Sequence, residues 1–153
     1  MTIFLVRHAH AGKRSDWKGD DTSRPISERG NSQTAAITEL LSDRSVRRVV
    51  SSPYLRCVQT VGPIAAAAGV EVEIDDRLAE GAGAGAALEL LLSLDSDHGV
   101  ACSHGDLIPA LLRRLVSMGM EIEGPLLDQK GSVWTITTND GHPVQGRYTP
   151  PRG

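Results

Sequence analysis

Short apolar runs alternate with longer segments of helical periodicity through most of this sequence, and that alternation is the strongest constraint on its fold. Four strand-like runs are expected, at residues 2–7, 46–50, 70–74 and 99–103. Helix-like segments follow them, at residues 33–41, 54–68, 88–94 (after a Gly-rich loop at 81–87) and 107–118. A helix that joins two strands normally returns the chain to lie parallel to the first strand. The order therefore predicts an α/β fold with three layers, a mostly parallel central sheet and helices on both faces.

The sequence changes character near its C-terminal end. Two further strand-like runs, 132–138 and 143–148, flank Asn139-Asp140-Gly141, which is a strong signal for a β-hairpin. With 153 residues and no internal repeat, the chain is expected to form a single domain over residues 1–153. Aromatic residues make up only 3% of the chain, so its core must be built from aliphatic side chains. Such a core suits helices packed on a parallel sheet.

Charge and composition exclude several classes of protein. A net charge of −3 does not indicate a surface for nucleic acid or for an anionic membrane. No stretch approaches the roughly 20 apolar residues that span a bilayer, and the chain opens directly in a strand-like run. Cys57 and Cys102 lie far apart and are expected to be small buried hydrophobes without a disulfide. We therefore expect a cytoplasmic protein, and no pattern indicates its oligomeric state.

Cationic and imidazole side chains follow the ends of three predicted strands. Arg7, His8 and His10 end the first strand, Arg56 follows the second, and His104 follows the fourth. Ligands of open α/β sheets bind beyond the carboxyl ends of the strands, so these side chains are expected to meet at one edge. Their mutual repulsion needs an anion to offset it, and a phosphoryl group fits because its transfer depends on charge stabilisation. A neutral histidine could then attack phosphorus and divide the transfer into two easier steps.

Four sequence blocks resemble the signature motifs of one protein family. They occur in the family's order and are L-V-R-H-A-H at 5–10, R-P-I-S-E-R-G at 24–30, S-S-P-Y-L-R-C-V-Q-T at 51–60 and S-H-G at 103–105. Together they resemble the histidine phosphatase (phosphoglycerate mutase-like) superfamily. In its short length the chain is similar to the SixA-type phosphohistidine phosphatases. The chain, particularly its D-D-T-S-R-P segment, is also similar to the phosphatase domain fused to Nudix domains in some actinobacterial proteins.

The resemblance implies a role for each matching residue. His8 would be phosphorylated during turnover, while Arg7, Arg56 and His104 would hold the phosphoryl oxygens. Glu80 matches a Leu-x-Glu context in which the family carries its proton donor, so it would protonate the leaving oxygen and then activate water.

Some positions leave more than one interpretation. Asp75 and Asp76 are alternative proton donors because they lie close to Glu80 in the sequence. Arg24 would bind substrate phosphate or pair with an acidic residue of its own loop. His10 stands where the family often has Glu, Gln or Asp, and it is assigned to the wall of the substrate site.

Two departures from the family pattern bear on the site. Ala9 replaces the usual glycine after the nucleophile, which is tolerable if the backbone there is not left-handed. The segment between Gly69 and Leu88 is short where larger relatives insert lid elements, so an open site is expected.

Two other classes of function compete with a phosphatase. His8-x-His10 could begin a zinc site, although only His104 and Asp106 could add ligands to it. A non-catalytic module that binds phosphorylated ligands would keep the arginines but would need neither nucleophile nor proton donor. The sequence thus predicts a metal-independent phosphatase that needs no cofactor. Its substrate is a phosphorylated small molecule or a protein that carries phosphohistidine, and the sequence does not choose between them.

Overall fold

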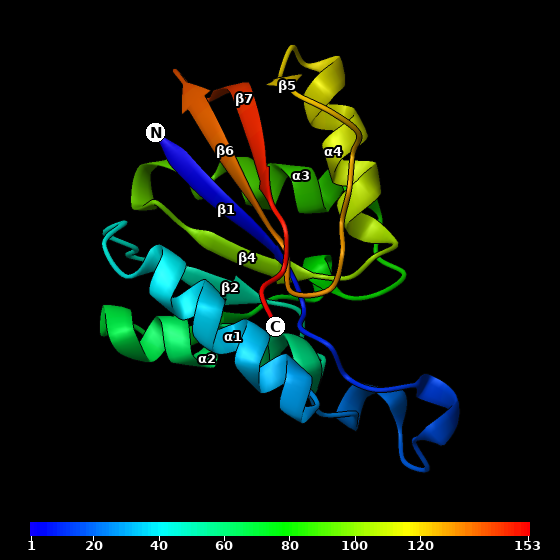
Figure 1. Ribbon diagram of the computed structural model, residues 1–153. Coiled ribbons are helices and arrows are strands. Elements are labelled where there is room, and N and C mark those ends of the chain that lie inside the picture. Colours follow the sequence, from blue (N-terminus) through cyan, green and yellow to red (C-terminus); the bar gives the residue numbers. More distant parts are fainter.

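Seven strands form one mixed sheet in the computed structural model, which describes residues 1–153 (Figure 1). Their order across the sheet is β3-β2-β4-β1-β6-β7-β5. The strands are β1 (Thr2–Arg7), β2 (Val49–Ser51), β3 (Val72–Ile74), β4 (Val100–Ser103), β5 (Glu121–Ile122), β6 (Val133–Asn139) and β7 (His142–Thr149). β1 pairs in parallel with β4, and β4 and β3 each pair in parallel with β2. β6 runs antiparallel to β1 and to β7.

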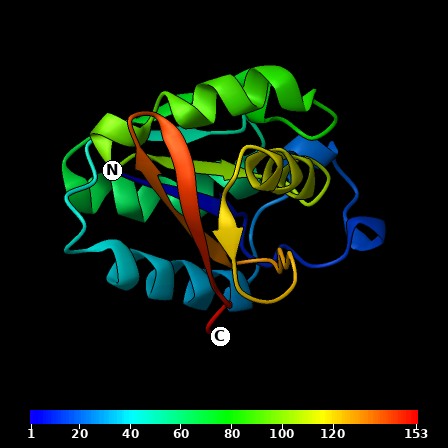
Figure 2. The same ribbon diagram turned by 90° about the horizontal axis from the view of Figure 1, so that it is seen from above.

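Helices cover both faces of this sheet (Figure 2). The main helices are α1 (Glu28–Leu41), α2 (Leu55–Ala68), α3 (Ala84–Leu92) and α4 (Leu107–Ser117). Four short 3₁₀ turns, η1 to η4, lie at Arg14–Asp16, Asp21–Ser23, Asp76–Leu78 and Asp95–Asp97. The predicted three-layer α/β class is confirmed, and the parallel part of the sheet carries the crossovers that the sequence order required.

The central strand β1 explains why two cores form. Successive side chains of a strand point to opposite faces. Ile3 and Leu5 therefore join the core beneath α3 and α4, while Phe4 and Val6 join the core beneath α1 and α2. All four side chains are buried. The uninterrupted apolar run that ends in Arg7 thus fixes β1 in the middle of the molecule and delivers its polar end to one edge.

The predicted C-terminal hairpin is present between β6 and β7. Asp140 and Gly141 both have positive φ, at 49° and 77°, which is the conformation that a tight two-residue hairpin turn requires. Gly141 adopts this backbone without strain because it has no Cβ.

Several elements differ from the sequence expectation: β3 begins at Val72 instead of residue 70, α3 spans Ala84–Leu92, and α1, β2 and β5 differ as follows. α1 begins at Glu28 instead of residue 33, because the Ser27 hydroxyl accepts a hydrogen bond from the Gly30 amide and starts the helix. In the first turn of α1 the side chains of Glu28, Arg29 and Asn31 are polar and exposed and only Gly30 is buried, so the turn carries no apolar period. β2 is shorter than the predicted run 46–50, and the two-residue strand β5 was not predicted.

Two features bear on the expected class of protein. None of the helices combines the length and the apolar character that crossing a membrane requires. Cys57 and Cys102 are free thiols and both are fully buried, as the sequence analysis expected.

Candidate active site

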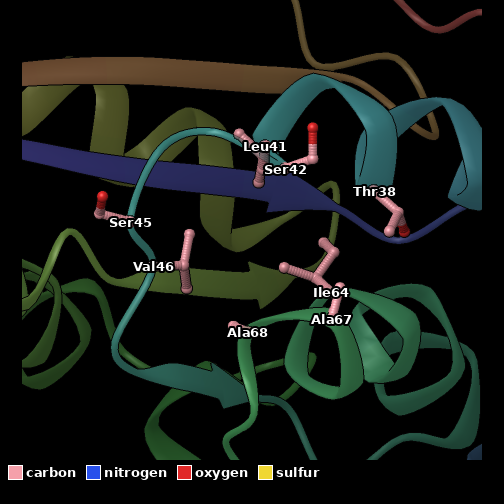
Figure 3. Close-up of a pocket in the computed structure, with 8 residues that line it drawn as sticks. All are labelled: Thr38, Leu41, Ser42, Ser45, Val46, Ile64, Ala67 and Ala68. Atoms are coloured by element: carbon pink, nitrogen blue, oxygen red, sulfur yellow. The ribbon is translucent and has the colours of Figure 1, made fainter.

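The charged cavity of the protein lies at the carboxyl ends of β1 and β4. It has a volume of about 510 Å³, and none of its lining residues is hydrophobic. The lining consists of Arg7, His8, Gly12, Lys13, Arg14, Ser15, Arg24, Arg56, Glu80, Gly105, Asp106 and Lys130. A smaller cavity of about 170 Å³ between the ends of α1 and α2 has Leu41, Val46 and Ile64 in its wall and no titratable side chain (Figure 3). Of these two cavities, only the charged one is lined by titratable side chains.

His8 is held neutral at the base of this cavity. Its side chain is 4% exposed. Burial, with smaller contributions from the nearby His104, Arg56 and Arg7, lowers the pKa of His8 from 6.5 to about 3. Its Nδ1 lies 2.9 Å from the carbonyl oxygen of Ala9, which can only accept, so Nδ1 carries the proton. The lone pair of Nε2 is consequently free, as a nucleophile requires.

The backbone after His8 is tied to α2. The Ala9 amide donates to Thr60 Oγ1 at 2.9 Å, and that hydroxyl donates to the Arg56 carbonyl at 2.6 Å. Ala9 is fully buried and its φ is not positive, so the methyl group in place of the family's glycine brings no backbone strain. These bonds tie the segment that carries His8 to the helix that carries Arg56.

Arg7 occupies space that the S-H-G motif leaves free. Its Nη1 donates to the Asp128 carbonyl at 2.8 Å. A Cβ built on Gly105 would lie 2.6 Å from Arg7 Cζ, closer than real contacts allow. The glycine of the motif is therefore required by the close approach of the guanidinium.

Arg56 is a buried cation whose partners lie in the long loop before α1. Its side chain is 1% exposed, and its guanidinium stacks over the Tyr54 ring at 4.8 Å. Nη1 donates to the Asp21 carbonyl at 2.8 Å, and Nη2 lies 3.2 Å from Asp21 Oδ2. Glu80 Oε2 lies farther away, at 3.8 Å.

Asp21 connects three arginines of the site. Its Oδ1 accepts from Arg24 Nε at 3.1 Å and lies 3.3 Å from Arg14 Nε, while Oδ2 faces Arg56. Partial burial acts against ionisation, but the hydrogen bond from Arg24 and the charge of Arg56 hold the pKa of Asp21 below its usual value. Arg24 thus pairs with an acid of its own loop, which is one of its two interpretations from the sequence, and it also lines the cavity.

His104 lies next to His8. It is 1% exposed, its ring centroid is 5.4 Å from that of His8, and its Nε2 bonds Ser52 Oγ at 2.8 Å. The edge of its ring meets Tyr54, with centroids 4.7 Å apart. The block that contains Ser52 and Tyr54 therefore positions His104 as well as Arg56.

Buried nitrogen atoms without a hydrogen-bond partner gather at this site. Four buried side-chain atoms lack a partner, and three of them are Arg7 Nε, Arg56 Nε and His104 Nδ1. Leaving a buried polar atom unpaired costs roughly 1–3 kcal/mol. These atoms belong to the three residues that the resemblance assigned to the phosphoryl oxygens.

Glu80 is anchored beside the turn that carries His104. The Ser103 hydroxyl donates to the Leu78 carbonyl at 2.7 Å, and the Gly81 amide donates to Asp106 Oδ2 at 2.7 Å. Glu80 itself lines the cavity and binds Arg14.

The two alternative proton donors do not share this placement. Asp75 pairs with Arg77 at 2.8 Å, and neither Asp75 nor Asp76 lines the cavity. Of the three acidic candidates, only Glu80 stands where it could reach a bound phosphate.

His10 is not brought into the cavity. Its Nδ1 lies 2.7 Å from Ser27 Oγ and its amide donates to Gln33 Oε1 at 2.8 Å, so it packs against the start of α1. A Cβ on Gly30 would lie 2.2 Å from the His10 carbonyl oxygen, which accounts for the glycine in R-P-I-S-E-R-G. This placement gives no support to the predicted contact between His10 and substrate.

The structure adds three cations that the motifs did not point to: Lys13, Arg14 and Lys130. All three stand in polar loop sequence without periodicity, and Lys13 and Arg14 lie within a few residues of the His8 motif in the chain. No signal in a single sequence singles them out.

The residues that could hold a metal ion are dispersed. No group of three or more His, Cys, Asp or Glu side chains is arranged to bind one. His8 and His10 direct their Nδ1 atoms to different partners, the Ala9 carbonyl and the Ser27 hydroxyl.

A buried neutral histidine ringed by arginines, at the carboxyl edge of a largely parallel sheet, is a site of the kind that handles phosphoryl groups. Residues 3–85 match the model of the histidine phosphatase superfamily (branch 1), and the chain belongs to that family.

Comparison with known proteins gives relatives of several kinds. The chain is 32% identical over 155 residues to an 8-oxo-(d)GTP phosphatase of Mycolicibacterium smegmatis, covering 98% of this chain and 48% of the relative. The chain thus spans about half the length of that relative. The protein histidine phosphatase SixA bound to tungstate shares its fold, with a TM-score of 0.77, 21% identity and coverage of 99% of this chain and 96% of the other. A mycobacterial glucosyl-3-phosphoglycerate phosphatase does so with a TM-score of 0.65, 18% identity and coverage of 96% of each chain.

Proposed function

We propose that this chain is a phosphatase that transfers a phosphoryl group to His8 Nε2 and then to water. The observation that carries the proposal is the neutral, buried His8 beside Arg7, Arg56 and His104, each of which has a buried nitrogen without a partner. Anionic phosphoryl oxygens are acceptors for such donors, and their charge offsets the repulsion among the cations. A module that only binds phosphorylated ligands would not need His8 to be neutral or Glu80 to line the same cavity.

The first step forms a phosphohistidine. The lone pair of His8 Nε2 attacks phosphorus while the bond from phosphorus to the leaving oxygen breaks, and Glu80 gives that oxygen its proton. In the second step Glu80, now a carboxylate, takes a proton from water as the water oxygen attacks phosphorus. The P–N bond breaks, phosphate leaves, and both His8 and Glu80 return to their starting states. The arginines hold the charge of the phosphoryl oxygens throughout.

The proposal assigns charge stabilisation to arginine and not to a metal ion. Arg7, Arg24 and Arg56 are fixed by hydrogen bonds to backbone carbonyls, so their charges are preorganised. The competing zinc hypothesis would need His8 and His10 to share an ion, and it would make turnover sensitive to chelators.

For the substrate, we propose a phosphorylated small molecule with more than one anionic group, and nucleotides first. Lys13 and Lys130 line the cavity and neither takes part in an ion pair. Partial burial, together with the nearby Arg7, Arg24 and Arg56, lowers the pKa of Lys130. A second anionic group of the substrate would offset this repulsion and stabilise the charged form of Lys130. The mycobacterial relative that matches nearly the whole chain is named for a nucleoside triphosphate. A protein phosphohistidine is the second candidate, because SixA shares the fold over 99% of this chain.

A substrate screen with purified protein tests the proposal. Nucleoside mono-, di- and triphosphates, sugar phosphates, p-nitrophenyl phosphate and a phosphohistidine protein are compared, each with and without EDTA. We expect hydrolysis by the wild type, no effect of EDTA and no hydrolysis by His8→Ala. Full activity of the variant would refute the role of His8. A chelator-sensitive rate that one divalent ion restores would instead support the zinc hypothesis.

A further inference from the structure

One of the arginines that line the charged cavity belongs to no motif. Arg14 lies in the 3₁₀ turn η1, and its side chain is 61% exposed. Its Nη2 nevertheless donates to both oxygens of Glu80, at 2.8 and 3.0 Å. These contacts raise the pKa of Arg14, with the hydrogen bond to Glu80 as the largest cause. An exposed ion pair of this kind adds little to stability, about 0–1 kcal/mol, so its geometry calls for another explanation.

Arg14 is part of a closed ring of four charged groups. It pairs with Glu80 and with Asp21, and both of these acids also face the buried Arg56. The two bonds from Arg14 to Glu80 are shorter than the 3.8 Å that separates Glu80 from Arg56. The Glu80 carboxylate is therefore held closer to the exposed Arg14 than to the buried Arg56.

We propose that Arg14 is the positioning residue of the proton donor. This inference rests on the proposed function and names a residue that acts through Glu80. Without Arg14, the Glu80 carboxylate has Arg56 as its nearest cation and would turn toward it. It would then compete with the phosphoryl group for Arg56 and would leave the position from which it reaches the leaving oxygen.

Substrate binding releases the Glu80 carboxylate from Arg14. An arriving phosphoryl dianion competes with Glu80 for Arg14, because the guanidinium lines the same cavity. The ion pair loosens as the substrate binds, and the freed Glu80 carboxylate then takes from solvent water the proton that it gives to the leaving oxygen in the first step. Arg14 thereby links the arrival of the anion to the state of the acid.

The experiment compares leaving groups. An alkoxide needs a proton as it departs, whereas p-nitrophenolate does not, so a defect in the acid slows alkyl esters selectively. We expect Arg14→Ala to lower kcat for an alkyl phosphate by about 10-fold or more and to change kcat for p-nitrophenyl phosphate much less. We expect Arg14→Lys to restore part of the loss. In a Glu80→Gln background, Arg14→Ala should have little further effect on alkyl ester turnover, because the group through which it acts is gone.

Arg77 provides a matched control. It is also an exposed arginine with two hydrogen bonds to one carboxylate, that of Asp75 at 3.0 and 2.8 Å, and it lies outside the cavity. We expect Arg77→Ala to leave kcat for both esters unchanged.

Four results would overturn the inference. Two concern Arg14→Ala alone: an equal loss of kcat for the alkyl phosphate and for p-nitrophenyl phosphate, or no loss of kcat for either. The third is a double variant in which the losses of kcat from Arg14→Ala and Glu80→Gln multiply. The fourth is a Glu80→Gln variant that slows both esters equally. Failure of the proposed function is distinguished by His8→Ala: activity in that variant, or none in the wild type, would refute the phosphohistidine route itself.

Discussion

At the scale of single residues, the site depends on how burial lowers the pKa of the His8 imidazole. Most histidines titrate near 6.5, but the pKa of His8 is lowered to about 3, chiefly because its side chain is removed from water. The residue is therefore neutral across the whole physiological range. The same burial makes His8 a source of acid sensitivity in the folded protein.

The pH dependence of stability provides the first prediction. Above pH 6.5, His8 is neutral in both the folded and the unfolded chain and has no linked effect. As the pH falls from 6.5 toward 3, the unfolded chain binds a proton that the folded chain does not, so the free energy of unfolding decreases. The loss is at most about 1.4 kcal/mol per pH unit for one group.

Urea unfolding of the wild type and of His8→Gln, from pH 7 to pH 4 in phosphate-free buffer, measures this loss of unfolding free energy. We expect the variant to lose stability less steeply, and parallel curves would contradict the assignment.

The second prediction concerns the contact between Gly105 and Arg7. Gly105→Ala would place a Cβ 2.6 Å from Arg7 Cζ, and Arg7 is held on its other side by the Asp128 carbonyl. The guanidinium must move away from the phosphoryl position, so we expect kcat/KM to fall roughly 10- to 1,000-fold while the fold persists. Steady-state kinetics measure the loss. Gly62→Ala is the control, because a Cβ there meets no atom within 4 Å. An unchanged rate in Gly105→Ala would show that Arg7 does not hold the phosphoryl group.

At the scale of elements, α1 is aligned by its first turn against the segment that follows β1. Gly30 lies in that turn, and a Cβ there would meet the His10 carbonyl oxygen and Ile26 Cβ. We therefore predict that Gly30→Ala costs about 1–3 kcal/mol of folding free energy, although alanine is normally the better helix former. Chemical denaturation measures the difference. A stabilised variant would mean that the helix shifts easily, and Gly62→Ala in α2 again serves as the comparison.

Elements were predictable where periodicity was strong. β1 is buried on both faces and its apolar run ends at a charged residue, so its bounds matched the sequence expectation. The start of α1 and the strand β5 were not predicted, because a polar first turn and a two-residue pair carry no period. Their positions follow from tertiary contacts, the Ser27 cap and pairing with β7.

The candidate site was predictable to the extent that strand ends converge. Arg7, His8, Arg56 and Glu80 line one cavity, and His104 lies next to His8. The sequence analysis assigned His10 to the wall of the substrate site, because a single sequence does not show that its side chain turns to Ser27. Arg14 could not be found either, since only the folded loop brings it to Glu80.

At the scale of the whole molecule, this chain spans about half the length of its mycobacterial relative. The residues that we propose as nucleophile, phosphoryl-binding cations and proton donor all lie within residues 7–130. We therefore expect the chain to turn over substrate on its own, without a second domain. A rate that appears only when another domain or protein is added would contradict this expectation.

The central claim of this account is that a covalent phosphohistidine forms at residue 8. The direct measurement is rapid quenching of the enzyme during turnover of a ³²P-labelled substrate, followed by peptide mapping. We expect label that is stable in base and labile in acid, located on His8, formed at the rate of turnover or faster and absent from His8→Ala. Turnover by an active wild type without any such label, or label on another residue, would contradict it.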